Sequence, residues 1–153
     1  MAAPFSPSFL NGEPRATAFL ADDFRDPARR AAKVRAAARR STSSATLAAL
    51  SSISARLAES SARRANLDRL SKGNAAVVVT GQQVGLFTGP LYAFVKAASA
   101  VSIARALSVE TGTPCVPVFW LQSEDHDFPE IDHCWVLPKS GEAVKLSLEG
   151  PGP

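Results

Sequence analysis

The hydrophobic pattern changes character along the chain. Leucine and isoleucine recur at helical spacing through residues 45–70, with arginines between them, which predicts one amphipathic helix there. Residues 27–40 are rich in alanine and arginine, and Asp26 followed by Pro27 is typical of a helix N-cap and first turn. Prolines punctuate residues 1–27, so we expect an extended arm packed onto a larger body rather than a long helix.

Two continuous apolar runs lie in the second half of the chain. Residues 75–80 and 115–121 lack polar alternation, which predicts two strands buried on both faces of a parallel sheet. A helix is predicted between them over residues 90–110, and Gly112 is a suitable residue to end it. The order strand, helix, strand predicts a right-handed βαβ unit in a doubly wound α/β sheet.

The remaining segments suggest how the chain is organised. Residues 133–137 and 143–148 flank a Lys-Ser-Gly-Glu turn and predict a β-hairpin. We therefore expect an N-terminal region of arm and helices over residues 1–70, followed by the first part of an α/β core over residues 71–153. The sequence stops at Glu-Gly-Pro-Gly-Pro directly after a predicted strand, so we expect it to be part of a longer protein.

Composition and charge narrow the class of protein. With 46% hydrophobic and 20% charged residues, the chain can form a packed core. Residues 1–70 carry 12 Lys and Arg against 6 Asp and Glu, but these basic residues are dispersed, which favours solvated helix faces over a nucleic-acid surface. Two cysteines are too few for a disulfide framework, the N-terminus lacks a signal-peptide pattern, and Lys96 and Arg105 interrupt the longest apolar stretch. We expect a cytoplasmic protein that binds neither nucleic acid nor membrane.

The first candidate site is the glycine-rich segment after the first predicted strand. Ligands of open α/β sheets bind at the carboxyl ends of the strands. Glycines allow positive φ and close approach of a ligand, and the following helix offers unpaired N–H groups to a phosphate or carboxylate. The segment matches neither the GxxxxGK[ST] loop nor the GxGxxG fingerprint, and a turn whose glycines serve only packing is the alternative. The candidate binding residues are Thr80, Gly81, Gln82, Gln83, Gly85, Thr88, Gly89, Tyr92 and Lys96.

The second candidate site is the acidic turn that follows the second strand. Carboxylates on both sides of His126 favour its protonated form, so that it could act as a general acid or base, or hold an anion. Mg²⁺ bound beside a nucleotide phosphate and an acidic surface turn without function are alternatives. A zinc site built from His126, His133 and Cys134 matches no standard spacing, and we predict no metal. The candidate catalytic residues are Glu124, Asp125, His126 and Asp127.

Two strings together resemble one enzyme family. Val-Thr-Gly-Gln-Gln-Val-Gly-Leu-Phe-Thr-Gly-Pro-Leu-Tyr at 79–92 and Pro-Val-Phe-Trp-Leu-Gln-Ser-Glu-Asp-His-Asp-Phe at 117–128 are similar to the BshC family of bacillithiol biosynthesis. The resemblance covers residues 75–135 strongly and the N-terminal part only in its layout. It implies a Rossmann-like core with inserted segments and a C-terminal coiled coil, outside this sequence, that forms a homodimer.

The resemblance also implies a reaction. Members of this family are described as ligases that add L-cysteine to glucosaminyl malate in the last step of bacillithiol synthesis. Condensing a carboxylate with an amine is uphill in water, so ATP is the expected activating nucleotide, with ATP or ADP bound in the core. Members run to several hundred residues, and we expect residues 1–153 alone to be inactive. The alternative is a non-catalytic α/β module that binds a nucleotide or sugar phosphate.

Overall fold

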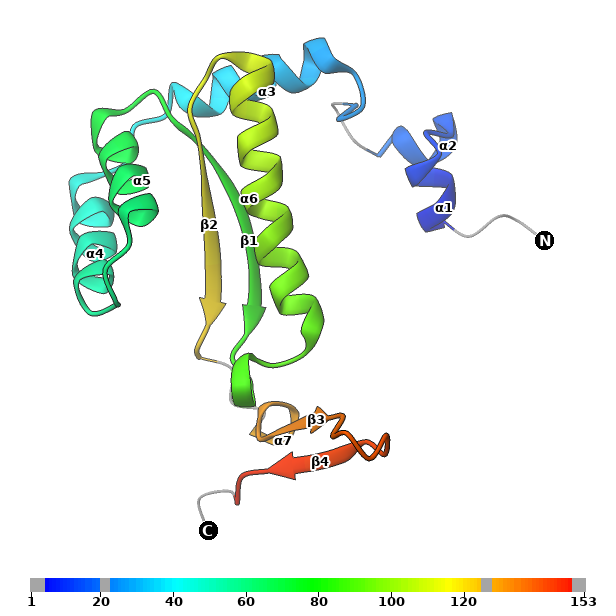
Figure 1. The fold of residues 1–153 in the computed structure, drawn as a ribbon. Coiled ribbons are helices and arrows are strands. Elements are labelled where there is room, and N and C mark those ends of the chain that lie inside the picture. The colour runs from blue at the N-terminus through cyan, green and yellow to red at the C-terminus, as the bar shows by residue number, and fades with distance from the viewer. Residues whose placement is uncertain (1–4, 20–22, 125–127, 150–153) are drawn as a thin grey trace.

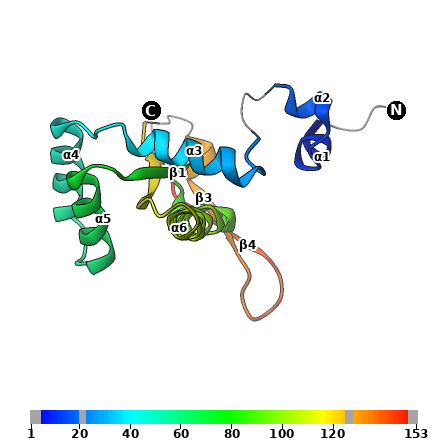
Figure 2. The ribbon, with the colours of Figure 1, turned by 90° about the horizontal axis from the view of Figure 1, so that it is seen from above.

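A computed structural model of the chain describes residues 5–19, 23–124 and 128–149 (Figure 1). The N-terminal arm forms two short helices, α1 (Phe5–Leu10) and α2 (Pro14–Thr17), in place of the predicted extended segment. Both helices lie apart from the sheet in two perpendicular views (Figures 1 and 2). The prolines prevent a long helix but are compatible with single turns, because proline is tolerated at the start of a helix.

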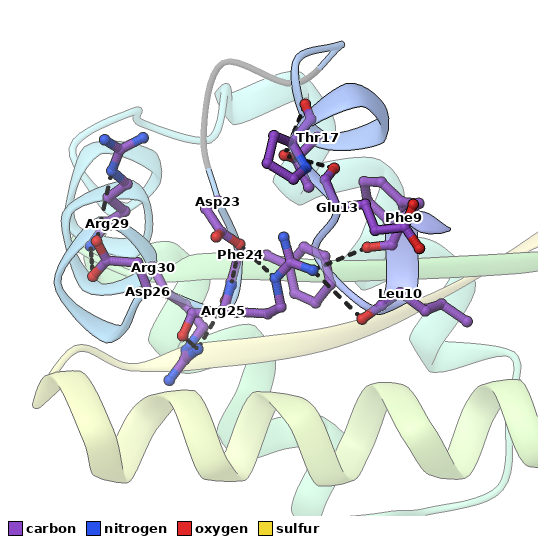
Figure 3. Close-up of polar contacts among 11 residues, drawn as sticks. Phe9, Leu10, Glu13, Thr17, Asp23, Phe24, Arg25, Asp26, Arg29 and Arg30 are labelled. Atoms are coloured by element: carbon purple, nitrogen blue, oxygen red, sulfur yellow. Dashed lines mark hydrogen bonds and ion pairs between the residues drawn. The ribbon is translucent and has the colours of Figure 1, made fainter. Parts of the chain in front are cut away.

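Arg25 holds this arm together (Figure 3). Its guanidinium donates to the backbone oxygen of Phe9 at 2.9 Å and pairs with the Asp23 carboxylate, also at 2.9 Å. The Phe9 oxygen, at the end of α1, also accepts a hydrogen bond from the backbone N–H of Gly12 at 3.0 Å. The hydrogen bond from Arg25 lowers the pKa of the Asp23 carboxyl group.

Helix α3 (Pro27–Ala38) begins as predicted. The Asp26 carboxylate accepts hydrogen bonds from two backbone N–H groups of the first turn, and proline occupies the first helical position. Arg30 of α3 donates to both carboxylate oxygens of Glu110, with the shortest distance 2.7 Å. Glu110 lies near the end of α6 (Leu91–Thr111), so this ion pair joins the N-terminal region to the core. The hydrogen bond to Glu110 raises the pKa of the Arg30 guanidinium.

The single helix predicted over residues 45–70 is wrong. The structure has two helices, α4 (Ser44–Ala55) and α5 (Ser61–Lys72), that pack side by side as a helical hairpin (Figure 1). Ser60 starts α5, because its side chain accepts a hydrogen bond from the backbone N–H of Arg63. The Arg63 side chain in turn donates to the Ser54 hydroxyl at 2.8 Å and ties the two helices together.

The core is a βαβ unit, as predicted. Strands β1 (Ala76–Gln83) and β2 (Cys115–Gln122) are parallel and paired along their whole length, and α6 connects them. Gly112 ends α6 in the left-handed conformation, with φ of 64°, which confirms its predicted role. Two boundaries differ from the prediction. Strand β1 continues through Gln83 into the segment expected to be loop, and Pro90 is the N-cap of α6 rather than its first residue.

The two faces of the sheet are covered by different helices. Neighbouring residues of a strand point to opposite faces. Cys115 packs with Ala104 of α6, whereas Val116 packs with Leu70 of α5. Helix α6 therefore lies on one face of β2, and the α4–α5 hairpin lies on the other. Small buried alanines on α6, such as Ala100, let this helix lie close to the strands.

The hairpin covers only the amino-terminal half of its face. Farther along that face, Val79 and Trp120 are both 63% exposed. The prediction that both strands are buried on both faces is therefore wrong for the carboxyl half of the sheet in the described chain. The periodicity of a strand shows which faces are apolar, but it does not show which covering element is present.

The C-terminal segment forms a small unit beyond the carboxyl ends of the two parallel strands (Figure 1). It consists of one turn of helix, α7 (Phe128–Ile131), and the antiparallel pair β3 (His133–Val136) and β4 (Val144–Ser147). The predicted hairpin is confirmed. The backbone N–H of Leu148 donates to the backbone oxygen of Asp132 at 2.8 Å, which closes the hairpin against α7.

Within the described residues, α6 is the one helix whose length and composition would allow it to cross a membrane. Over the 18 most apolar consecutive residues of α6 the mean hydropathy is 1.2, and 17% of these residues are buried. The same composition suits the central helix of a βαβ unit, and α6 packs along both β1 and β2. The expectation that the chain has no membrane span stays a prediction.

Candidate functional site

The two sequence motifs come together at one edge of the sheet. Gln83, the last residue of β1, pairs with Gln122, the last residue of β2. The first motif continues from β1 into a turn and α6, and Ser123 and Glu124 of the second motif follow directly after β2. Glu124 is exposed, and residues 125–127, with the proposed Asp125, His126 and Asp127, lie outside the described residues.

Gly81 serves strand pairing rather than the close approach of a ligand. It lies opposite Trp120 in the register of the sheet. A Cβ atom at position 81 would lie 2.6 Å from the backbone oxygen of Trp120 and 3.0 Å from its Cβ. The expectation that this glycine makes room for a ligand is therefore corrected, because the space is taken by the neighbouring strand.

The turn after β1 has an unusual backbone. Phe87, Thr88 and Gly89 all have positive φ, at 51°, 77° and 75°. Such values are costly for residues with a Cβ, above all for a β-branched threonine, and they cluster at functional sites. Gly85 is extended, and a Cβ there would lie 2.8 Å from the Cα of Gly89. The two glycines thus let the turn close on itself, and Gly89 has the positive φ expected of the motif.

Lys96 organises the base of the loop from the second turn of α6. Its ammonium donates to the Gln82 side-chain oxygen at 2.8 Å and to the backbone oxygen of Gly81 at 3.3 Å. It also lies 4.9 Å from the centre of the Tyr92 ring, within the range of a cation–π interaction. The Gln82 amide nitrogen then donates to the Tyr92 hydroxyl at 3.0 Å. Four of the predicted binding residues therefore form one fixed array.

An apolar cavity opens beside this array, between β1, β2 and the start of α6. Its volume is about 400 Å³, within the range of small-molecule sites. Phe94 of α6 and Phe119 and Leu121 of β2 supply much of its wall, and residues from the glycine turn complete it. We call this space the apolar cavity. Its lining residues are Gln82, Gln83, Val84, Gly85, Thr88, Ala93, Phe94, Ala97, Phe119 and Leu121.

A second hollow also lies beside the glycine turn. Its volume is about 300 Å³, and it shares four residues with the apolar cavity. Ile131 and His133 reach it from the C-terminal unit, while Tyr92 reaches it from α6. We call it the loop hollow. Its lining residues are Gln82, Gln83, Val84, Gly85, Gly89, Pro90, Tyr92, Ile131 and His133.

Most of the predicted binding residues therefore line one of the two spaces. Three of them, Thr80, Gly81 and Lys96, line neither, and Lys96 acts through Gln82 and Tyr92 instead. The apolar walls were not predicted, because Phe94 and Phe119 read from sequence as ordinary core residues. Their nearness to the motif follows from the parallel register and could not be read from local pattern.

No metal centre is visible in the part of the chain that the structure describes. No group of three or more His, Cys, Asp or Glu side chains is placed there to hold an ion. Burial raises the pKa of the Cys115 thiol, which suits a core residue better than a ligand or a nucleophile. Because His126 lies outside the described residues, the prediction that the acidic turn holds no metal stays open to test.

The fold and the site define a class. A parallel βαβ unit with a glycine turn and a cavity at the carboxyl ends of its strands is the arrangement of part of a Rossmann-like α/β domain. The family described as "Bacillithiol biosynthesis BshC, N-terminal Rossmann-like domain" matches residues 2–152. The chain belongs to this family, which confirms both the recognised resemblance and the Rossmann-like fold.

Curated relatives agree with this membership. The chain is 49% identical over 90 residues to "Putative cysteine ligase BshC" of Solibacter usitatus, which covers 56% of this chain and 17% of the relative. It is 58% identical over 76 residues to the protein of that name from Koribacter versatilis, covering 50% of this chain and 14% of the relative. The corresponding protein of Heliobacterium modesticaldum is 55% identical over 69 residues, 45% of this chain and 13% of the relative. The aligned part is therefore between about one eighth and one sixth of each relative's length.

Proposed function

We propose that this protein, at the length of its relatives, is an amide-forming ligase that adds L-cysteine to glucosaminyl malate in the last step of bacillithiol synthesis. The observation that carries the proposal is the position of the apolar cavity and loop hollow. Both lie at the shared carboxyl edge of two parallel strands, in a chain that belongs to the BshC family. The name "cysteine ligase" of the relatives supports the choice of reaction.

The two spaces suit a ligand with one apolar and one polar end. Phe94, Phe119 and Leu121 offer flat and aliphatic surface to a ring such as a nucleobase. The loop hollow includes Gly89 and Pro90 at the N-terminus of α6, where the first N–H groups have no partner within the helix and the helix dipole favours an anion. ATP fits this arrangement, and it would supply the group that activates a carboxylate.

We propose that the acidic turn acts on the activated group. Two observations support this: Gln83 and Gln122 pair at the ends of β1 and β2, and Ser123 and Glu124 of the second motif follow β2 directly. We propose that His126, with Glu124, Asp125 and Asp127, orients the attacking amine or transfers its proton. No resident metal is needed for this role.

Turnover by the full-length protein tests the proposal. The protein, ATP, L-cysteine and glucosaminyl malate are incubated, and the cysteine adduct is measured by mass spectrometry. Gln82→Met removes both hydrogen bonds of the Gln82 amide at similar side-chain size, and we expect at least a tenfold loss of kcat/KM. Gln122→Met is the matched control, because Gln122 ends the neighbouring strand but lines neither space. Absence of adduct from the wild-type protein refutes the ligase, and equal rates in both variants refute the site.

A non-catalytic binding module is the second candidate. The lining of the apolar cavity favours it, since that lining consists of apolar side chains, neutral amides, glycine and threonine. Calorimetric titration with ATP, ADP and glucosaminyl malate separates the two functions. Tight binding without adduct in the full-length protein would favour the module.

The same proposal covers the cellular location, the oligomeric state and the partners of the protein. We propose that it works in the cytoplasm as a homodimer, joined through a C-terminal region outside residues 1–153. We propose that nucleic acid and membrane are not among its partners. Two arginines of the N-terminal helices support this because they bind within the fold, Arg30 to Glu110 and Arg63 to Ser54. A gel-shift titration that shows no binding of DNA or RNA at either low or high salt would agree with this.

A further inference from the structure

An aspartate–histidine pair, Asp132 and His133, lies at the loop hollow. Nδ1 of His133 and a carboxylate oxygen of Asp132 are 2.8 Å apart. The two side chains are 26% and 23% exposed, so both are largely withdrawn from solvent yet reachable. His133 lines the loop hollow together with Gln82 and Tyr92 from the first motif.

The backbone of this pair is held on both sides. Asp132 donates its N–H to the oxygen of Phe128 at 2.9 Å and accepts from the N–H of Leu148 at 2.8 Å. His133 is the first residue of β3 and pairs with Ser147 across the hairpin. A histidine fixed in this way presents its ring in one orientation, which is what a proton-transferring group needs.

The hydrogen bond decides which ring nitrogen can act. A carboxylate only accepts hydrogen bonds, so Nδ1 of the neutral imidazole carries the proton that Asp132 binds. Nε2 then holds the lone pair and can take up a proton. The carboxylate also stabilises the imidazolium that forms, as in other histidine–carboxylate pairs.

We propose that His133 is the general base of the amide-forming step and that Asp132 is its positioning residue. This inference rests on the proposed ligase activity. The nitrogen of the amine attacks a carboxyl carbon that ATP has activated as a mixed anhydride with phosphate. The C–N bond forms, the C–O bond to the phosphate group breaks with its electron pair leaving on that group, and the proton of the amine passes to Nε2 of His133.

The test uses the full-length protein and separates kcat from KM. His133→Ala should lower kcat about 100-fold or more, the usual contribution of a general base, with KM for each substrate changed less than threefold. Added imidazole should restore part of the rate, which a merely structural role for His133 would not allow. Ser147→Ala is the matched control, since Ser147 faces His133 across the hairpin and should leave kcat unchanged.

A second variant guards against loss of folding. Asp132→Asn keeps the shape of the pair but removes its charge, and we expect a smaller loss of kcat with KM preserved. Wild-type kcat in either variant, or a loss confined to KM, overturns the assignment while leaving the ligase intact. No adduct from the wild-type protein would instead refute the ligase, and the role of His133 with it.

Discussion

Replacing Gly81 by alanine tests the packing between the two strands most directly. The added methyl group would lie 2.6 Å from the backbone oxygen of Trp120, about 0.8 Å inside the closest ordinary contact of 3.4 Å. A backbone atom in a paired strand cannot rotate away, so the strands must separate locally. Forcing an extra methyl group into packed structure costs about 1–3 kcal/mol.

The unfolded state offsets part of this cost. Alanine has fewer accessible backbone conformations than glycine, which favours the folded state by about 0.4–1 kcal/mol where the conformation is unstrained. Taking the middle of each range, about 2 and about 0.7 kcal/mol, we expect Gly81→Ala to lower the free energy of unfolding by about 1.3 kcal/mol. We also expect the substitution to displace Gln82, the next residue, and this displacement should weaken ligand binding at the site.

Urea unfolding and calorimetric titration of the full-length protein measure the two effects. Gly112→Ala is the matched control, because a Cβ there meets nothing within 4 Å and its cost comes only from a φ of +64°. That variant should lose about 1 kcal/mol of stability without loss of ligand affinity. Unchanged stability and affinity in Gly81→Ala would show that the strands are not in close contact at this position, and the account of this glycine would be wrong.

Three further predictions concern the rest of the chain. Glu110→Gln should lower the melting temperature slightly, and the difference should shrink in 1 M salt, because the Arg30 pair that joins α3 to α6 is partly exposed. Cys115 should react with a thiol reagent far more slowly than the half-buried Cys134, since burial both covers the thiol and raises its pKa, and mass mapping of labelled peptides measures the ratio. The hydrogen bond from Arg25 lowers the pKa of the Asp23 carboxyl group in the folded state below its ordinary value of about 3.8. The stabilisation from this contact is therefore present above pH 3.8 and is lost as the pH falls through the folded-state pKa. Asp23→Asn should therefore be less stable than wild type at pH 7, and in urea titrations this difference should shrink as the pH falls through the folded-state pKa of Asp23.

The sequence by itself determined the elements of the core. β-branched and apolar runs predicted both parallel strands, and Gly112 and Asp26 marked helix ends correctly, because strand propensity and helix capping are local properties. The order of those elements predicted the βαβ unit, and two motif strings indicated the family. Helical spacing did not reveal the break between α4 and α5, since a pattern of leucines continues in phase across a short turn.

Only the tertiary structure decided how the site is built. The role of Gly81 depends on Trp120, the walls of the apolar cavity depend on Phe94 and Phe119, and the meeting of His133 with the glycine turn depends on the placement of the hairpin. These residues are distant in sequence, and parallel strand register and chain reversal bring them together. Local pattern carries no information about such contacts, because each partner keeps the same propensity whether or not the other is near.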